Sequence, residues 1–88
     1  MIPKQATKIY RYRERDKKGS GEQFNDALVE AYAQIKANPF AFQLRKDHYR
    51  HAHLHRLKYR VVYEVEGNDV YVYQIRHTSR KVSKRFGP

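Results

Sequence analysis

The sequence predicts an α+β domain in which an antiparallel β-meander follows a helical N-terminal half. Three observations predict this class. Residues 59–66 and 69–77 are dominated by β-branched and aromatic residues, as is typical of strands. Gly67-Asn68 between them is a short loop of the kind that supplies the positive backbone angles of a two-residue hairpin. Upstream, apolar residues recur at helical spacing in the segment that begins at Ser20.

The 88-residue chain carries a formal net charge of +10 and no cysteine. Its length predicts one small domain, residues 1–88, with a basic tail at 78–88 that is either a short helix or mobile. The absence of cysteine excludes disulfides and thiolate metal ligands. No apolar run approaches the roughly 20 residues of a membrane span, and no signal-peptide pattern is present. We therefore expect a cytoplasmic protein without a membrane partner.

The positive charge is unevenly distributed. Residues 41–88 hold 11 Lys or Arg against 4 Asp or Glu, whereas residues 1–40 hold 8 against 5. From Arg76 onward there are five basic residues and no acid. Such a field predicts a polyanionic or acidic partner, either nucleic acid, the ribosome or an acidic protein segment. A solvated basic surface with no preferred partner is the simpler alternative.

The first segment, residues 1–18, is the hardest to interpret. Its apolar residues alternate with arginines, as in a strand. A helix from about Gln5 to Lys17 is equally compatible, with Ile9 and Tyr12 on one side. Lys17-Lys18-Gly19 ends whichever element precedes it.

The next segment has a clear helical pattern. Ser20 followed by Gln23 has the form of a capping box, in which both side chains satisfy free backbone N–H groups. Asn38-Pro39 marks the end of the helix, because proline disfavours α geometry in the preceding residue. The residues at helical spacing form a stripe wide enough to lie on a sheet, namely Phe24, Ala27, Leu28, Ala31, Tyr32 and Ile35.

The connection at residues 40–47 carries Phe42 and Leu44, which we expect to anchor it under the sheet edge. Three strands are predicted after it: Arg50 to Arg56, Tyr59 to Glu66 and Asp69 to His77. Leu57-Lys58 is a weaker turn than the glycine-containing one, because neither residue favours positive backbone angles.

Two-residue turns fix a register, and the register sorts side chains onto two faces because they alternate across a sheet. Arg56 then pairs with Tyr59, and Glu66 with Asp69. One face is apolar and predicts the core: Ala52, Leu54, Val61, Tyr63, Val65, Val70 and Val72. The other, which we expect to be open, is basic and aromatic: His51, His53, His55, Arg60, Val62, Glu64, Tyr71, Tyr73, Ile75 and His77. A slip of one residue at the weaker turn would reverse the sorting.

Short motifs in this order of elements resemble the RelE/ParE superfamily of bacterial type II toxin–antitoxin toxins. They are Gly21-Glu22-Gln23-Phe24, Ile35-Lys36-Ala37-Asn38-Pro39-Phe40, Tyr59-Arg60-Val61-Val62-Tyr63-Glu64-Val65 and a ParE-like ending, Arg76-His77-Thr78-Ser79-Arg80. The resemblance covers roughly residues 7–86. It implies two N-terminal helices, the first at residues 5–17, packed on one face of a three-stranded antiparallel meander. It also implies growth inhibition, plasmid stabilisation and a cognate antitoxin as partner.

The family usually begins with a β-strand. Here only Met1 to Gln5 precede the matched region, and Pro3 suits a strand poorly. We therefore expect the first strand to be missing and one sheet edge to have unpaired backbone groups. Such an edge favours a homodimer, or a protein that is unstable without its partner.

RelE-like members cut messenger RNA on the ribosome, which requires cations at the scissile phosphate, a general base and a general acid. Histidine titrates near neutrality and suits both proton-transfer roles. If this chain is such a ribonuclease, the resemblance gives as catalytic candidates His51, His53, Arg60, His77 and Arg80. Where RelE has a tyrosine near its end this chain offers Phe86, which cannot transfer a proton.

ParE-like members lack a catalytic set and inhibit DNA gyrase by binding it, and the ending His77-Thr78-Ser79-Arg80 favours this branch. The basic face and tail then bind the target or the antitoxin, with binding candidates His55, Tyr71, Tyr73, Arg76, Lys81, Lys84 and Arg85. A non-toxic module that binds nucleic acid or an antitoxin is a third alternative.

Simpler interpretations apply to the same residues. The alternating histidines have metal-like spacing but no cysteine or clear fourth ligand beside them, so we expect no metal site and no cofactor. They could be a solvated polar face, and Arg60 could pair with Glu64 two residues along its strand. Tyr71 and Tyr73 could stack RNA bases or lie under an antitoxin helix, of which we favour the second.

Overall fold

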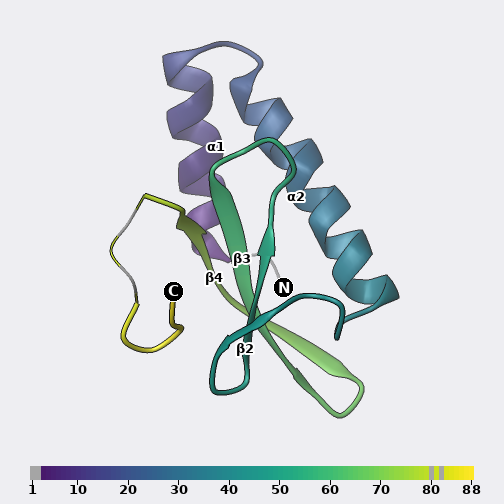
Figure 1. Ribbon diagram of the computed structural model, residues 1–88. Helices are drawn as coiled ribbons and strands as arrows, with labels where there is room; N and C mark the ends of the chain where they lie inside the picture. Colours follow the sequence, from purple (N-terminus) through teal and green to yellow (C-terminus); the bar gives the residue numbers. More distant parts are fainter. Residues whose placement is uncertain (1–2, 80, 82) are drawn as a thin grey trace.

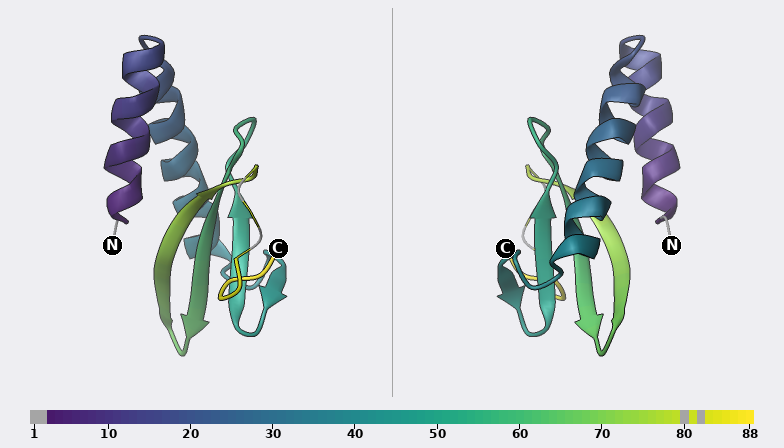
Figure 2. Two further views of the ribbon diagram at one scale, coloured as in Figure 1. Left: turned by 90° about the vertical axis from the view of Figure 1, so that its left-hand side faces the viewer. Right: turned by 90° about the vertical axis from the view of Figure 1, so that its right-hand side faces the viewer.

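The computed structural model describes residues 3–79, 81 and 83–88. These residues form two helices followed by a four-stranded antiparallel sheet (Figure 1). The elements are α1 (Lys4–Asp16), α2 (Ser20–Ala37), β1 (Leu44–Lys46), β2 (Tyr49–His53), β3 (Tyr59–Glu66) and β4 (Asp69–His77). The strands lie side by side in the order β1-β2-β3-β4. Figure 2 shows both helices on one side of the sheet and the C-terminal segment on the other.

The predicted α+β class is confirmed, but the three-stranded sheet is wrong by one strand. The additional β1 pairs with β2 through a tight turn at Asp47, whose φ is 50°. Aspartate tolerates this left-handed conformation, so the hairpin forms without a glycine. With β1 in place, β2 begins at Tyr49 and ends at His53, rather than running from Arg50 to Arg56.

The two helices form an antiparallel hairpin. The N-terminal segment, for which the sequence allowed either a strand or a helix, forms the helix α1. The expected capping box of Ser20 and Gln23 is wrong, because Gly19 is the N-cap of α2 and no side chain caps it. Instead Glu14 of α1 accepts a hydrogen bond of 2.9 Å from the backbone N–H of Gly21. The start of α2 is therefore held by its neighbouring helix. No helix among the described residues is long and apolar enough to cross a membrane.

The stripe of α2 packs on the sheet as predicted. Phe24 is fully buried and lies edge-on to Tyr59, with ring centroids 5.3 Å apart. Tyr63 is also fully buried, and its hydroxyl donates to the carbonyl oxygen of Pro39 at 2.6 Å. The core on this side of the sheet consists of Ala6, Phe24, Ala27, Leu28, Ala31, Ile35, Ala52, Leu54, Tyr59, Val61, Tyr63 and Ile75. Such burial contributes roughly 1.5–3 kcal/mol for each large side chain.

Two residues that we expected to be buried, Leu44 and Val70, are exposed. Phe42 packs edge-on against Tyr63, with centroids 6.4 Å apart, but Leu44 is 47% exposed. Val70, which was expected in the core, is 37% exposed near the tip of the β3–β4 hairpin. The helices cover the other end of the sheet, so this tip remains in solvent (Figure 2).

The register of β2 against β3 differs from the expected one by two residues. Ala52 pairs with Val61 rather than with Tyr63, because the loop is longer than Leu57-Lys58. Arg56 in that loop has a φ of 62°, so Arg56 provides the positive backbone angle that Leu57 and Lys58 do not favour. A shift of two residues keeps every side chain on its face, so the sorting of β2 and β3 is confirmed although the register is not.

Candidate functional site

The candidate site lies on the sheet face turned away from the helices, which we call the tail-covered face. Its residues are Tyr49, His51, Arg60, Val62 and Tyr73. The pairings His51 with Val62 and His53 with Arg60 bring the predicted basic row of β2 beside β3. The expectation that this face is open is wrong, since His51 is 2% exposed and Arg60 is 9% exposed.

The C-terminal segment, residues 83–88, covers this face (Figures 1 and 2). The Phe86 ring stands edge-on to Tyr49 with centroids 4.8 Å apart, and it shares a second apolar cluster with Val62 and Tyr73. Gly87 has a φ of 85°, and a Cβ there would lie 2.6 Å from the Cβ of Lys46. The tail is therefore neither a helix nor detached from the domain over these residues, because one buried phenyl ring fixes it to the sheet.

Hydrogen bonds attach the tail to the basic groups beneath it. His51 donates from Nε2 to the carbonyl oxygen of Phe86 at 2.8 Å, because a carbonyl can only accept. Arg60 donates to the main-chain oxygen of Pro88 at 3.0 Å. Arg76 donates to the carbonyl oxygen of Lys81 at 2.7 Å. Main-chain oxygens of the C-terminal segment therefore accept the hydrogen bonds that we expected an acidic partner to accept.

Glu64 does not pair with Arg60, so that simpler interpretation is wrong. Its carboxylate accepts a hydrogen bond from the Tyr73 hydroxyl and lies 3.1 Å from Nε2 of His48. The bond to Glu64 raises the pKa of Tyr73 to about 12, so this phenol stays protonated. Tyr73 is thereby fixed in the sheet as a donor and is only partly accessible for stacking.

Two buried basic side chains on this face, His51 and Arg60, have lowered pKa values. Burial lowers the pKa of His51, and Arg60 and Arg45 lower it further against the opposing effect of the Phe86 carbonyl. Burial also lowers the pKa of Arg60, followed by the effects of Arg45 and Arg76. The causes are shared, because both groups are buried and have positively charged neighbours.

A bulge in β4 separates His77 from the other candidates. The register changes between Val72 and Gln74, so that Tyr73 is the extra residue and Tyr59 pairs with His77. Beyond the bulge every side chain changes face. Ile75 lies in the helix-side core and His77 stands edge-on to Tyr59 at 5.1 Å, so placing both on the open face is wrong.

The remaining histidine candidates are exposed. His53 lies at the end of β2 beside Arg60, on the predicted face. His55 lies in the β2–β3 loop rather than on a strand, because β2 has already ended. It lines a shallow groove with Glu30 and Gln34 of α2, so its placement in the sheet row is wrong.

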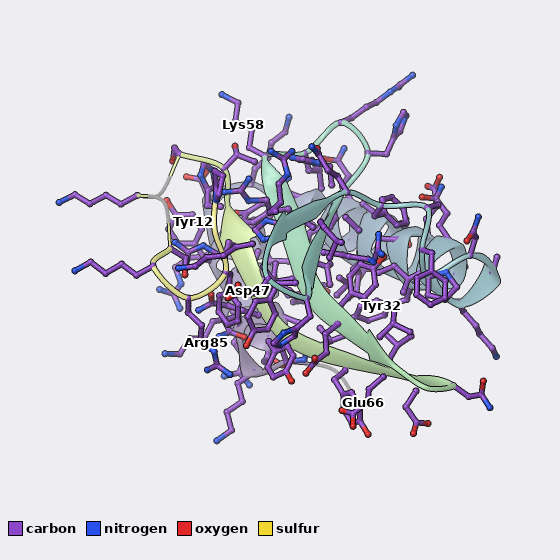
Figure 3. All side chains as sticks on the ribbon, turned by 60° about the horizontal axis from the view of Figure 1, so that its bottom comes forward. Tyr12, Tyr32, Asp47, Lys58, Glu66 and Arg85 are labelled. Carbon is purple, nitrogen blue, oxygen red and sulfur yellow. The ribbon has the colours of Figure 1, made fainter. Side chains whose placement is uncertain are left out.

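The basic and aromatic binding candidates differ in accessibility. Tyr71 is 45% exposed, and Lys81 and Lys84 are also exposed. The Arg85 guanidinium lies 5.0 Å from the Phe86 ring centroid and close to the rings of Tyr49 and Tyr73, a cation–π arrangement. Figure 3 shows Arg85 beside the C-terminal segment, far from Tyr32 on α2. Arg80 lies outside the described residues.

Two residues on this face or close to it, Arg45 and Tyr49, were not identified from the sequence. Arg45 lies in the unpredicted strand β1, and nothing in its neighbourhood indicated a strand. Tyr49 continues the alternation of His51 and His53 by one step, and this spacing could have identified it. Among the described residues, no group of three or more His, Cys, Asp or Glu side chains is arranged to hold a metal ion.

Comparison with known proteins agrees with this fold. The model of a protein family described as "ParE toxin of type II toxin-antitoxin system, parDE" matches residues 3–82. Searches of curated proteins and of solved structures gave no match. The family match spans most of the chain, and the protein therefore belongs to the ParE toxin family, within the RelE/ParE superfamily. Membership in a type II toxin family implies an antitoxin as partner.

Proposed function

We propose that this protein inhibits growth by binding DNA gyrase, and that its antitoxin blocks it by covering basic and aromatic surface. The family match to ParE toxins supports the toxin assignment. The choice of a binding mechanism rests on the dispersal of the catalytic candidates. His77 faces the helices, whereas His51 and Arg60 lie under residues 83–88 on the opposite side of the sheet. A general base and a general acid must both reach one substrate, and this arrangement does not favour that.

The binding surface in this proposal consists of exposed members of the predicted set, without His55, which lies in the β2–β3 loop beside α2. They are Tyr71 of β4 and Lys81, Lys84 and Arg85 of the C-terminal segment, all of which are exposed. Their charge favours an acidic antitoxin segment or an acidic patch on gyrase. Because the protein's formal net charge is +10, association with such a partner is expected to be fast and to weaken with salt.

A RelE-like, ribosome-dependent ribonuclease is the second candidate, and one observation favours it. His53 is exposed at the end of β2 and lies directly across from Arg60 of β3. A histidine that could act as a base is therefore the cross-strand neighbour of a cation that could contact phosphate once residues 83–88 no longer cover it. A non-toxic binding module remains the third candidate. Homodimerisation also stays a prediction: among the described residues, β4 pairs only with β3, which leaves one of its edges unpaired.

Induced expression with two read-outs tests the proposal. Growth arrest with intact messages and loss of plasmid supercoiling is the expected result. Growth arrest with messages cut at ribosomes would instead select the ribonuclease, and no growth effect would select the inert module. Co-expression of a small acidic protein encoded beside the gene is expected to restore growth if that protein is the antitoxin.

A matched pair of variants sharpens this experiment. His53→Ala removes the accessible histidine next to Arg60, and His55→Ala removes an exposed loop histidine as a control. Both side chains are exposed, so both variants should fold. Under the gyrase proposal, the two variants arrest growth as the parent protein does. Loss of toxicity in His53→Ala alone would contradict the proposal and favour ribonuclease chemistry.

A further inference from the structure

Helix α1 presents a row of cations to solvent. Its exposed basic residues recur at helical spacing, so they lie within about 60° of one another around the axis and extend over about 16 Å of the helix. Neighbours in the row are three or four positions apart, which places their Cβ atoms about 5–6 Å from each other. We call this row the α1 stripe: Lys4, Lys8, Arg11 and Arg15.

The α1 stripe does not stabilise its own helix. Like charges three or four positions apart repel each other. Lys4 lies in the first turn, where the helix dipole disfavours a cation, and this turn has no acidic residue and no side-chain cap. Among the described residues, none of the four side chains takes part in an ion pair or a hydrogen bond. The stability of the helix therefore does not explain the row.

The acidic residues near the α1 stripe are directed elsewhere. Glu14 accepts a hydrogen bond of 2.9 Å from the backbone N–H of Gly21, and Glu22 accepts one of 2.6 Å from the Tyr10 hydroxyl. Both contacts join α1 to α2. The two acidic residues of α1, Glu14 and Asp16, lie about 90–110° around the axis from the centre of the stripe. The stripe therefore has one sign of charge along its length.

A groove with a volume of about 650 Å³ lies beside the α1 stripe, between α1 and β4. Lys8 belongs to both, and Ile9 and Tyr12 complete the lining from the helix. On the sheet side the lining includes Tyr59 and His77, whose rings stand edge-on with centroids 5.1 Å apart. Tyr12 is 67% exposed. None of the described residues that line the groove is acidic.

We propose that the α1 stripe and this groove bind a single strand of nucleic acid, with phosphates along the stripe and a base against Tyr12. Evenly repeated cations are complementary to a polymer with evenly repeated negative charges. Proteins that bind single strands combine such a positive track with aromatic side chains on which bases stack. The exposed ring of Tyr12 favours a nucleic acid over an acidic polypeptide, because the carboxylates of a polypeptide offer no face for stacking.

This site is separate from the proposed gyrase-binding surface. That surface uses Tyr71 of β4 and basic residues of the C-terminal segment, whereas the new site centres on α1. The variants described below leave the gyrase-binding residues unchanged. A failure of the nucleic-acid site would therefore leave the proposed function standing, and growth arrest would still test that function by itself.

Fluorescence anisotropy of the full chain with a labelled oligothymidylate tests the site. Saturable binding that weakens with salt is the expected result. Counterion release on a single strand gives a slope of about −0.7 in log K against log salt for each phosphate neutralised, so the four stripe cations contribute about −3. Absence of saturable binding, or an affinity that does not depend on salt, would overturn the proposal.

A matched pair of lysine variants separates the α1 stripe from general attraction to a basic protein. Lys8→Gln removes a stripe cation, and Lys36→Gln removes an exposed lysine in the last turn of α2. The first variant should bind the strand about threefold more weakly, with a salt slope reduced by about 0.7. The second should bind as the parent does. Equal weakening in both variants would overturn the proposal.

A pair of aromatic variants tests the groove. Tyr12→Leu removes the exposed ring, and Phe40→Leu removes a ring of similar exposure, 62%, outside the site. Loss of one stacked base should weaken binding at least about fivefold in Tyr12→Leu. The salt slope should not change, because no charge is lost. Phe40→Leu should bind as the parent does, and parent-like affinity in Tyr12→Leu would overturn the proposal.

Three probes identify the class of partner: oligothymidylate, oligouridylate and a poly-glutamate peptide of the same charge. Tighter binding of the strands than of the peptide is the expected result. A preference for one strand assigns the site to DNA or to RNA, and equal affinity assigns it to the phosphodiester backbone that both share. Binding of poly-glutamate as tight as that of both strands would overturn the proposal, since any polyanion would then suffice.

Discussion

Both faces of the sheet are covered away from the β3–β4 tip, one by the helices and one by the C-terminal segment, and the two are covered by different chemistry. The helix-side face packs Phe24, Leu28 and Ile35 of α2 against apolar strand residues, and its core is purely hydrophobic or aromatic. The tail-covered face buries His51 and Arg60 beside Phe86 under residues 83–88. The first arrangement carries most of the stability. The second holds a histidine and an arginine under a short C-terminal segment.

The largest effect is expected from Phe24→Ala on the helix side. Its ring is fully buried, with 0% exposure. Truncation of a buried phenylalanine lowers the free energy of unfolding by about 3–5 kcal/mol, a large part of the about 5–15 kcal/mol of a typical domain. Urea denaturation measures the change, and Val29→Ala, on an exposed part of the same helix, is the control. A loss below about 1 kcal/mol would contradict the assignment of the main core to this face.

A smaller loss is expected from Phe86→Ala on the other side. The tail can detach from the sheet, so the cost is limited to the burial of one ring, about 1.5–3 kcal/mol. The helix-side core should survive, with cleavage by a protease confined to the tail. Phe40→Ala is the control, because that ring is 62% exposed. Loss of all cooperative unfolding in Phe86→Ala would show that the two faces are not independent.

The variant Gly87→Ala tests the close contact between the C-terminal segment and β1. A Cβ there would lie 2.6 Å from the Cβ of Lys46, whereas a Cβ at Gly19 would have nothing within 4 Å. Both glycines have positive φ, so each alanine carries a left-handed strain of about 1–2 kcal/mol. We expect Gly87→Ala alone to expose the tail to proteolysis. Equal protection of the tail in both variants would argue against this contact.

The smallest effect is a pH dependence to which His51 contributes, together with His53, whose pKa is also lowered by burial. The folded-state pKa of His51 lies below the ordinary value of 6.5, mainly because of burial. As the pH falls below about 6.5, the unfolded chain therefore binds the proton first, and stability is lost through the folded-state pKa. His51→Gln keeps an N–H donor for the Phe86 carbonyl and should flatten this part of the curve. Urea midpoints between pH 8 and pH 5 measure this slope in the parent and in the variant, and an unchanged slope in His51→Gln would contradict the assignment.

The helix-side face was largely predictable from the sequence. The strands β3 and β4 have the predicted ends, because their β-branched and aromatic runs stop at Gly67-Asn68. The stripe beginning at Phe24 identified the helix face in contact with the sheet. These features follow from local periodicity, which is what an amino-acid sequence displays most directly.

The tail-covered face was predicted only in part. Alternation placed His51 and Arg60 together, but it could not detect the extra residue Tyr73, so Ile75 and His77 beyond it were assigned to the wrong face. Phe86 is a single apolar residue in a basic tail, so no periodic pattern indicated that it returns to the sheet. Contacts between such distant segments depend on tertiary packing and not on local sequence.

The central claim is that residues 83–88 lie on the sheet face opposite the helices and cover its cations. Nuclear Overhauser effects between the Phe86 ring and the rings of Tyr49 and Tyr73 test it most directly in solution. The ring centroids are 4.8 Å and 6.0 Å apart, so strong cross-peaks are predicted. Random-coil shifts for residues 83–88, with no cross-peak from Phe86 to either tyrosine, would contradict the claim.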